Sequence, residues 1–351
     1  MGPAAGDGRR GGVPLPRAGR GSLPVRSSGA GGGTAVTTRR GRSAHRHAAA
    51  VVDSDEALLA TALPFLEDGL RAGDRTLLSC RESTADLVRS ALGPHGATIE
   101  NDPRVRMTGV RAPDAIVVTF RHLDRVDGSG RLRLLGEVDF GGAPRDWREA
   151  ERYESAANAV LAGAPLTVLC LYDRRVLSDQ AVATASLTHP ELVVDGRRTA
   201  NAGFRPPEEH LRALPVPREG AEAGPPVLAV DDAVSLAGLR RQLGVVLSAV
   251  VRDPEQGEDL HLAVSEIASN AFRHGVRPVS ARVWADGKHV VCTVTDRGHS
   301  FDDPLAGFRP AHGTDLGRGG MGLWLARKLW DSVDLIAGTE GLTVRLCSRI
   351  R

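Results

Sequence analysis

Lysine is scarce in this sequence: only Lys288 and Lys328 occur in 351 residues, against many arginines. A phosphate-binding P-loop requires a lysine directly after its glycines. Because no lysine precedes Lys288, the part of the chain before it cannot contain a P-loop. Nucleotide chemistry of that kind is therefore excluded from the N-terminal half.

Cysteine is also scarce, and the four cysteines are far apart with no C-x-x-C pair. This spacing predicts a reduced, cytoplasmic chain without a structural metal site. No apolar run approaches the roughly 18 residues that a membrane span needs, and the N-terminus lacks the apolar core of a secretory signal. The formal net charge is only +2, so nothing in the composition indicates nucleic acid or an anionic membrane as a partner.

Residues 1–46 are rich in Gly, Arg, Ser and Pro and have few large apolar side chains. Such a segment buries too little surface to offset an ordering entropy of roughly 1–2 kcal/mol per residue, so we predict a disordered leader. From His47 onward, helical and strand patterns alternate up to about residue 200. The expected elements are helices at 54–73, 83–92 and 147–161, and strands at 75–80, 115–120 and 166–172. This alternation predicts an α/β domain with a mostly parallel sheet.

The segment 201–226 carries six prolines among Glu, Gly and Arg, which predicts a semi-extended linker. His210 within it weakly matches the phosphoacceptor segment of histidine kinases. Those enzymes place that histidine on a long two-helix hairpin, for which the flanking prolines leave no room. A linker histidine is therefore the better interpretation of His210. For the whole chain, a sensor histidine kinase is the least favoured alternative, behind the two functions described below.

The most informative stretch is the run from Asp259 to Gly275. Its apolar residues recur at helical spacing, and Glu266 and Asn270 are four residues apart, so both side chains lie on one flank of the predicted helix. His274 and Gly275 follow where the helix should end, with glycine supplying a left-handed turn. Taken alone, this pattern is as typical of an amphipathic helix that packs on the core and has polar residues along one edge as it is of a binding site.

Two later stretches favour a binding site over a plain core helix. Asp296-Arg297-Gly298 follows a strand-like run at 289–295, and a glycine-rich segment at 317–323 leads into a helix around Trp324. Glycines before a helix leave backbone N–H groups free to face an anion, and the helix dipole adds to the attraction. The three blocks follow one another in a fixed order: the helix with Glu266 and Asn270, the strand that ends in D-x-G, and the glycine-rich lid that leads into a helix. This order indicates a binding site far more specifically than any one block does.

These three blocks resemble the N, G1 and G2 boxes of the GHKL (Bergerat-fold) ATPases, most closely the anti-sigma-factor serine/threonine kinases of bacterial stress and sporulation switches. The resemblance covers about 227–351 and implies an α/β sandwich with a mixed sheet. Its expected elements are strands at 227–230, 279–285, 289–295 and 342–347, a helix at 235–251, an Asp286-Gly287 hairpin and a lid loop at 301–319.

The resemblance also implies cofactors and roles for individual residues. ATP and Mg²⁺ are the implied cofactors, with Asn270 as the metal ligand and Asp296 accepting a hydrogen bond from the adenine amine. Glu266 would act as general base towards a partner's serine or threonine hydroxyl, and Arg318 would neutralise the γ-phosphate. The remaining candidate nucleotide-contacting residues are His274, Gly298, Gly319, Gly320, Met321, Gly322 and Leu323.

Two functions follow from the resemblance. In the first, the protein is an ATP-dependent serine/threonine kinase that phosphorylates an anti-anti-sigma (STAS-type) protein and sequesters a sigma factor. In the second, it binds nucleotide and holds a partner without phosphoryl transfer. Glu266 favours the first function, whereas Ser300, where many members of the family have a glycine, favours the second. The family also implies a homodimer.

The N-terminal domain, residues 47–200, resembles the MEDS sensory domain of methanogen and methylotroph regulators. The matching residues include His47, the R-Y-E-S-A-A-N segment at 152–158, the C-L-Y-D segment at 170–173 and His189-Pro190. The resemblance implies a degenerate RecA-like α/β fold that senses a small organic ligand and controls the ATPase-like domain. The candidates for a polar pocket near the strand ends are Asp139, Glu154, Tyr172 and Asp173. The alternative is that Tyr172 and Asp173 merely cap a core strand.

Overall fold

The computed structural model describes residues 45–105, 110–128, 130–299, 301–309 and 320–351. Residues 1–44 of the leader predicted at 1–46 lie outside the described residues. Strand β1 begins at Arg46, so the last residue of the predicted leader belongs to the folded domain.

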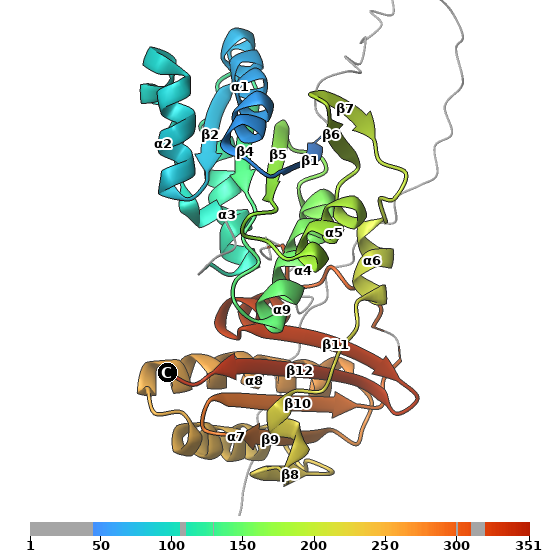
Figure 1. The fold of residues 1–351 in the computed structure, drawn as a ribbon. Helices are drawn as coiled ribbons and strands as arrows, with labels where there is room; N and C mark the ends of the chain where they lie inside the picture. Colours follow the sequence, from blue (N-terminus) through green and yellow to red (C-terminus); the bar gives the residue numbers. More distant parts are fainter. Residues whose placement is uncertain (1–44, 106–109, 129, 300, 310–319) are drawn as a thin grey trace, which may run out of the picture. The chain divides into compact units, whose positions relative to one another are not determined.

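The N-terminal sheet has the order β3-β2-β4-β5-β1-β6-β7 among the described residues (Figure 1). All of its strand pairs are parallel except β6 with β7. The strands are β1 (Arg46–Val52), β2 (Arg75–Ser79), β3 (Glu100–Asn101), β4 (Leu132–Glu137), β5 (Leu166–Asp173), β6 (Glu191–Val194) and β7 (Arg197–Ala200). The prediction of a mostly parallel α/β sheet is therefore confirmed.

Neighbouring residues of the central strands point into different cores. Leu134 and Cys170 belong to the apolar cluster on one face of the sheet, whereas Leu135 and Leu171 belong to the cluster on the other. A parallel sheet with helices on both faces requires this pattern of burial. The helical segments of this domain are α1 (Asp55–Ala72), α2 (Glu82–Ala91), η1 (Gly93–Thr98), η2 (Pro103–Val105), α3 (Ala112–Leu123), α4 (Pro144–Val160) and α5 (Asp179–Thr188).

The strand predicted at 115–120 is wrong, because these residues form the middle of helix α3. Its β-branched run, Ile116 to Thr119, suggested a strand. Pro113 in the first turn, Asp114 beside it and buried residues at helical spacing instead favour a helix. Strand β4, which the sequence analysis missed, supplies the strand in the sheet.

Helix α1 shows that local capping was read correctly. The Ser54 hydroxyl accepts a hydrogen bond from the Ala57 N–H at 3.1 Å, which satisfies one donor of the first turn. At the other end, Gly73 has a φ of 71°, the left-handed conformation that closes helices.

The C-terminal sheet has the order β11-β12-β10-β9-β8 among the described residues, and every pairing in it is antiparallel. The expected mixed sheet is therefore corrected: β9–β10 and β11–β12 are hairpins, and β8 with β9 and β10 with β12 are also antiparallel pairs. The strands are β8 (Leu228–Val230), β9 (Ser280–Ala285), β10 (His289–Asp296), β11 (Ser332–Gly338) and β12 (Gly341–Arg349). The predicted hairpin at Asp286-Gly287 is confirmed, with Gly287 at a φ of 81°.

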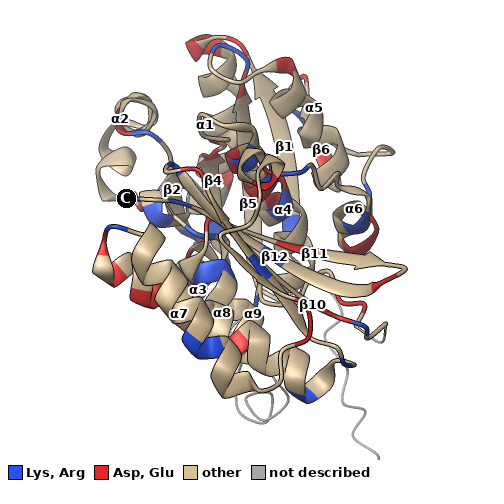
Figure 2. Cartoon of the chain, turned by 90° about the horizontal axis from the view of Figure 1, so that it is seen from below, with Lys and Arg blue, Asp and Glu red and all other residues tan. Residues whose placement is uncertain are grey.

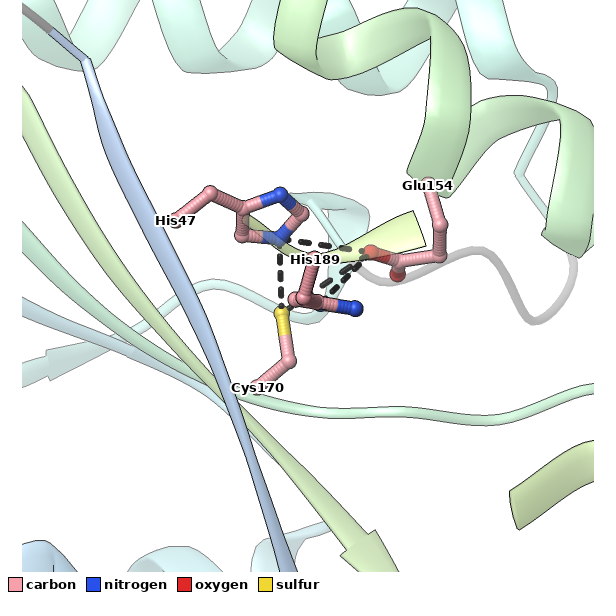
Figure 3. Close-up of side chains that lie close together, drawn as sticks. All are labelled: His47, Glu154, Cys170 and His189. Carbon is pink, nitrogen blue, oxygen red and sulfur yellow. Dashed lines mark hydrogen bonds and ion pairs between the residues drawn. The ribbon is translucent and has the colours of Figure 1, made fainter. Parts of the chain in front are cut away.

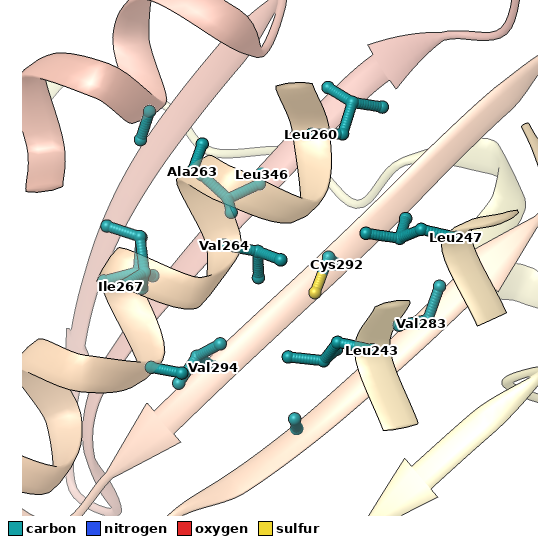
Figure 4. Close-up of a cluster of buried hydrophobic side chains, with 14 of the residues drawn as sticks. Leu243, Leu247, Leu260, Ala263, Val264, Ile267, Val283, Cys292, Val294 and Leu346 are labelled. Atoms are coloured by element: carbon teal, nitrogen blue, oxygen red, sulfur yellow. The ribbon is translucent and has the colours of Figure 1, made fainter. Parts of the chain in front are cut away.

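Helices α7 (Leu236–Val250), α8 (Pro254–His274) and α9 (Gly320–Leu329) pack on one face of this sheet. Figure 4 shows Leu243 and Leu247 of α7 and Val264 and Ile267 of α8 directed at the strands. Their apolar partners on the sheet are Val283, Cys292, Val294 and Leu346. The helical periodicity predicted for α7 and α8 thus corresponds to the face that is buried.

The segment predicted as a semi-extended linker contains α6 (Pro207–Ala213) and the short η3 (Gly220–Ala223). His210 on α6 is buried, with Nε2 3.0 Å from Glu151 of α4. Glu219 is also fixed to α4, because its carboxylate lies 3.1 Å from Arg148 and pairs with Arg145.

A buried ion-pair cluster joins α4 to β11 and β12 within the compact unit Gly41–Arg351. Arg152 of α4 and Arg345 of β12 both contact the carboxylate of Asp334, at 2.5 and 2.7 Å. These cations lower the pKa of Asp334 against the opposing effect of its burial. The cluster therefore neutralises a carboxylate that would otherwise be costly to bury.

Basic and acidic residues are interspersed among the helices and loops (Figure 2). Within the described residues, no helix is both long and apolar enough to cross a membrane.

Replacing Leu243 by Ala is expected to lower the free energy of unfolding of the C-terminal domain by about 2–5 kcal/mol. Leu243 is fully buried between α7 and the sheet, so truncation leaves a cavity. Val245→Ala on the same helix is the matched control, because Val245 is 66% exposed and its truncation should change stability by less than about 0.5 kcal/mol. Urea unfolding followed by tryptophan fluorescence measures both; equal destabilisation by the two variants would contradict this packing.

Candidate functional site

One cavity of about 210 Å³ in the C-terminal domain brings together several of the predicted site residues. Asn270 and His274 reach it from α8, Asp296 and Gly298 from the end of β10, and Leu323 from α9. These residues come from three blocks that are separate in the sequence. Their convergence is what the order of the blocks led us to expect.

Asp296 is held rigidly at the end of β10. Its Oδ1 atom accepts hydrogen bonds from the backbone N–H groups of Val276, at 3.1 Å, and Gly298, at 2.7 Å. The residue is 7% exposed. Because both bonds use Oδ1, the carboxylate keeps a defined orientation while Oδ2 can accept a further hydrogen bond.

Two glycines allow the backbone to approach this carboxylate. A Cβ atom on Gly275 would lie 2.4 Å from Cγ of Asp296, and one on Gly298 would lie 2.6 Å from its Oδ1. Any larger residue would displace the carboxylate. The left-handed turn expected at Gly275 is wrong, because its φ and ψ are −81° and −178°. Close approach, and not a left-handed conformation, requires glycine at this position.

Asn270 and Glu266 lie one turn apart on α8, next to the start of α9. A Cβ atom on Gly322 would lie 2.7 Å from Nδ2 of Asn270 and 3.4 Å from Cβ of Glu266. Gly322, in the described part of the glycine-rich segment, therefore meets the Asn270 flank of α8, as the motif suggests. Gly320 and Met321 belong to the first turn of α9. The predicted residues Arg318 and Gly319 lie outside the described residues.

Arg240 is a polar neighbour of this site that the sequence analysis missed. Its Nη2 atom lies 3.3 Å from Oε1 of Glu266, and the guanidinium also donates to the carbonyl oxygen of Ser265. Both side chains of the ion pair are partly exposed, at 38% and 39%. Arg240 lies on α7, and only the packing of α7 against α8 brings it to Glu266.

Apolar side chains form most of the remaining wall of the cavity. They are Ile267, Ala271, Val294, Phe301, Leu335, Leu342 and Val344. Leu342 and Val344 alternate along β12, so the period-2 pattern of that strand was a signal that could have identified them. Apolar walls with a few fixed polar groups suit a flat heteroaromatic ring that carries hydrogen-bonding groups at its edge.

The N-terminal domain has a smaller cavity, of about 50 Å³, lined by two of its four candidate residues, Asp139 and Glu154. His45 also lines it, and burial, followed by the charge of a neighbouring histidine, lowers the pKa of His45 to about 3. Tyr172 is fully buried, and neither it nor Asp173 lines this cavity.

Asp173 fits the alternative interpretation, that it caps a core strand. Its carboxylate accepts hydrogen bonds from the backbone and side chain of Arg175 directly after β5. These bonds lower the pKa of Asp173.

Two family models match the chain. The model of the MEthanogen/methylotroph, DcmR Sensory domain (MEDS) matches residues 46–190, and that of the histidine kinase-like ATPase domain matches residues 229–348. The first match covers the parallel sheet up to α5, and the second covers the antiparallel sheet with the 210 Å³ cavity.

Curated relatives match the same two regions. The serine-protein kinase RsbW of Bacillus pumilus is 32% identical over 126 residues, which cover 32% of this chain and 73% of that protein. RsbW of Bacillus subtilis is 31% identical over 124 residues, covering 32% of this chain and 72% of that protein. The transcriptional repressor DcmR of Methylorubrum extorquens is 25% identical over 158 residues, covering 42% of this chain and 59% of that protein.

The antiparallel sheet, the three sequence blocks around one cavity and these matches agree: the chain carries a MEDS domain followed by a histidine kinase-like ATPase domain, and through the latter it belongs to the family of the RsbW serine-protein kinases.

Proposed function

We propose that this protein is an ATP- and Mg²⁺-dependent serine/threonine kinase of the anti-sigma type, which phosphorylates an anti-anti-sigma protein under the control of its MEDS domain. The observation that carries the proposal is the convergence of Asn270 and Asp296 on one cavity, with Glu266 one helical turn from Asn270. The similarity to serine-protein kinases named RsbW supports the reaction type.

Asp296 is suited to recognise adenine. Its Oδ1 atom is occupied by two backbone donors, so Oδ2 is the atom that would accept a hydrogen bond from the exocyclic amine of the base. The apolar side chains from α8, β10 and β12 would enclose the ring. The two close glycines, Gly275 and Gly298, keep this edge of the cavity free of side-chain atoms.

Asn270 is suited to hold a magnesium ion beside the phosphates of a bound nucleotide. Mg²⁺ prefers oxygen ligands and keeps several waters, so one amide oxygen from the protein is sufficient beside the phosphate oxygens. Gly322 leaves room against Asn270 where a side chain would contact its amide. When bound, the ion would neutralise charge on the phosphates, while the start of α9 would face them with its dipole.

Glu266 is the candidate general base. Its side chain is 39% exposed, so the hydroxyl of a partner's serine or threonine can reach it. In the proposed reaction, Glu266 accepts the hydroxyl proton as that oxygen attacks the γ-phosphorus and the bond to ADP breaks. Arg318, the residue proposed to neutralise the γ-phosphate, lies outside the described residues.

A second candidate function is nucleotide binding without phosphoryl transfer. The ion pair between Arg240 and Glu266 favours it, because a carboxylate engaged by a guanidinium is less available as a base. Under this alternative the protein would hold its partner in a nucleotide-dependent manner only.

Asp296→Asn is expected to weaken ATP binding about 10- to 150-fold, which corresponds to about 1.5–3 kcal/mol for a hydrogen bond to a charged group. Isothermal titration calorimetry with ATP and Mg²⁺ measures the change. Asp259→Asn removes the same charge from an exposed position on α8 and serves as the control. Equal affinities of the Asp296 variant and the wild-type chain would refute the proposed adenine contact.

Glu266→Gln is expected to leave ATP binding within about twofold and to lower phosphoryl transfer by about 10²- to 10⁴-fold, since the amide cannot accept the proton. Transfer of label from γ-labelled ATP to serine or threonine of anti-anti-sigma proteins is the measurement. Glu258→Gln, exposed on the same helix, is the matched control. ATP binding by the wild-type chain without any label transfer would support the second function and not the kinase.

A further inference from the structure

Four buried side chains of the N-terminal domain point at one another: His47, Glu154, Cys170 and His189 (Figure 3). One nitrogen, oxygen or sulfur atom from each lies within 4.8 Å of the corresponding atoms of the others. They come from four separate places, namely β1, α4, β5 and the residue after α5. The nucleotide site does not involve this cluster.

The register of the sheet explains why two of them share a face. Strands β1 and β5 are parallel neighbours, with Ala49 paired with Cys170. His47 lies two residues before Ala49, so its side chain projects from the same face of the sheet as the Cys170 thiol. Helix α4 covers this face, because its Ala150 and Ala157 belong to the same apolar cluster as Cys170.

Hydrogen bonds on the far side of the His47 ring determine which nitrogen carries its proton. The amide nitrogen of Asn158 donates to the carbonyl oxygens of Thr188, at 2.7 Å, and Glu154, at 3.0 Å. The amide oxygen of Asn158 therefore faces His47 Nδ1 at 3.0 Å and needs a donor. The proton of His47 is thus on Nδ1, and Nε2 directs its lone pair into the cluster.

The ring of His189 is oriented in the same way. Its Nδ1 atom lies 3.2 Å from the carbonyl oxygen of Ala185, which can only accept a hydrogen bond, and 3.0 Å from the Thr188 hydroxyl. That hydroxyl donates its own proton to the carbonyl oxygen of Thr184 at 2.9 Å, so Nδ1 carries the proton of the imidazole. The lone pair of Nε2 then faces Oε2 of Glu154 at 3.5 Å, and Nε2 has no hydrogen-bond partner among the described residues. Two lone pairs and a carboxylate therefore converge in one buried space, where the Cys170 thiol is the donor that faces them and where a bound cation would balance their charge.

Four of the six distances among these atoms lie between 3.2 and 3.9 Å, near the spacing of a tetrahedral coordination shell. His47 Nε2 lies 3.2 Å from Cys170 Sγ and 3.4 Å from Glu154 Oε2, and Glu154 Oε2 lies 3.9 Å from Cys170 Sγ. Bonds of about 2.0–2.3 Å from zinc to nitrogen, oxygen and sulfur place tetrahedral ligands about 3.3–3.6 Å apart. Small movements of these side chains would complete the shell.

We propose that His47, Glu154, Cys170 and His189 form a four-coordinate binding site for a divalent cation of the zinc class. Two imidazoles, one thiolate and one carboxylate suit zinc and disfavour magnesium and calcium, which require oxygen ligands. Asn158 and the Ala185 carbonyl are the outer hydrogen-bond partners that orient the two imidazoles. Three of the four ligands, His47, Glu154 and Cys170, line the cavity of about 50 Å³, which leaves space beside the site.

Metal content and cobalt spectroscopy of the full chain, prepared without a histidine tag, test the proposal. After chelation, reloading with zinc and desalting, we expect one zinc ion per chain by mass spectrometry. Cobalt in place of zinc is expected to give a thiolate-to-cobalt charge-transfer band. Cys170→Ala should abolish this band, whereas Cys80→Ala, which removes a buried thiol of the same domain, should retain it.

Two further variants keep the test decisive if Cys170→Ala fails to fold. His189→Gln keeps the size of the side chain and should weaken zinc binding at least tenfold, and Asn158→Ala should weaken it about 10- to 100-fold through the orientation of His47. The proposal is overturned if the folded wild-type chain retains no zinc, or if the cobalt band persists in folded Cys170→Ala. It is equally overturned if His189→Gln and Asn158→Ala bind zinc like the wild type.

Discussion

The C-terminal domain depends on how the carboxylate of Asp296 is buried at the end of β10. Burying a carboxylate is costly unless hydrogen bonds replace those made by water, and two backbone N–H groups supply them here. These donors belong to the turn after α8 and the turn after β10. One carboxylate thus fixes the end of a helix relative to the end of a strand, and the cavity forms between them.

Glycines make this arrangement sterically possible on three sides. Gly275 and Gly298 lie against the carboxylate, and a Cβ atom on Gly341 would lie 2.0 Å from the carbonyl oxygen of Asp296. Gly341 also has a φ of 119°, which side chains rarely permit. The glycines around Asp296 are therefore best explained by the close meeting of α8, β10 and β12, which in turn exposes the polar edge of the cavity.

The N-terminal domain relies on the same principle, the convergence of polar groups from distant segments inside an apolar domain. Absence of paired cysteine motifs led us to expect no structural metal site. The proposed site needs only one cysteine, because two histidines and a glutamate supply the other ligands. Its ligand Glu154 lies two residues after Arg152, which pairs with Asp334 of β11. Helix α4 thus contacts both the proposed metal site and the sheet of the ATPase domain.

The sequence alone determined the elements whose signals are local. Capping at Ser54 and Gly73, the apolar stripes of α7 and α8, the Asp286-Gly287 hairpin and the order of the three nucleotide-site blocks can all be read within short windows, because they depend on neighbours a few residues away. For the same reason, the run from Ile116 to Thr119 misled: its β-branched residues have a local preference that packing of α3 overrides.

Only the tertiary structure decided which distant residues meet. The ion pair of Arg240 with Glu266, the antiparallel pairing of β12 with β10 and the grouping of His47, Glu154, Cys170 and His189 join segments from different parts of the chain. Hydrophobic burial is non-directional, so the apolar pattern of a helix states that a face is covered but not by what. Strand order and helix packing supply that information, and the chemistry of both candidate sites follows from it.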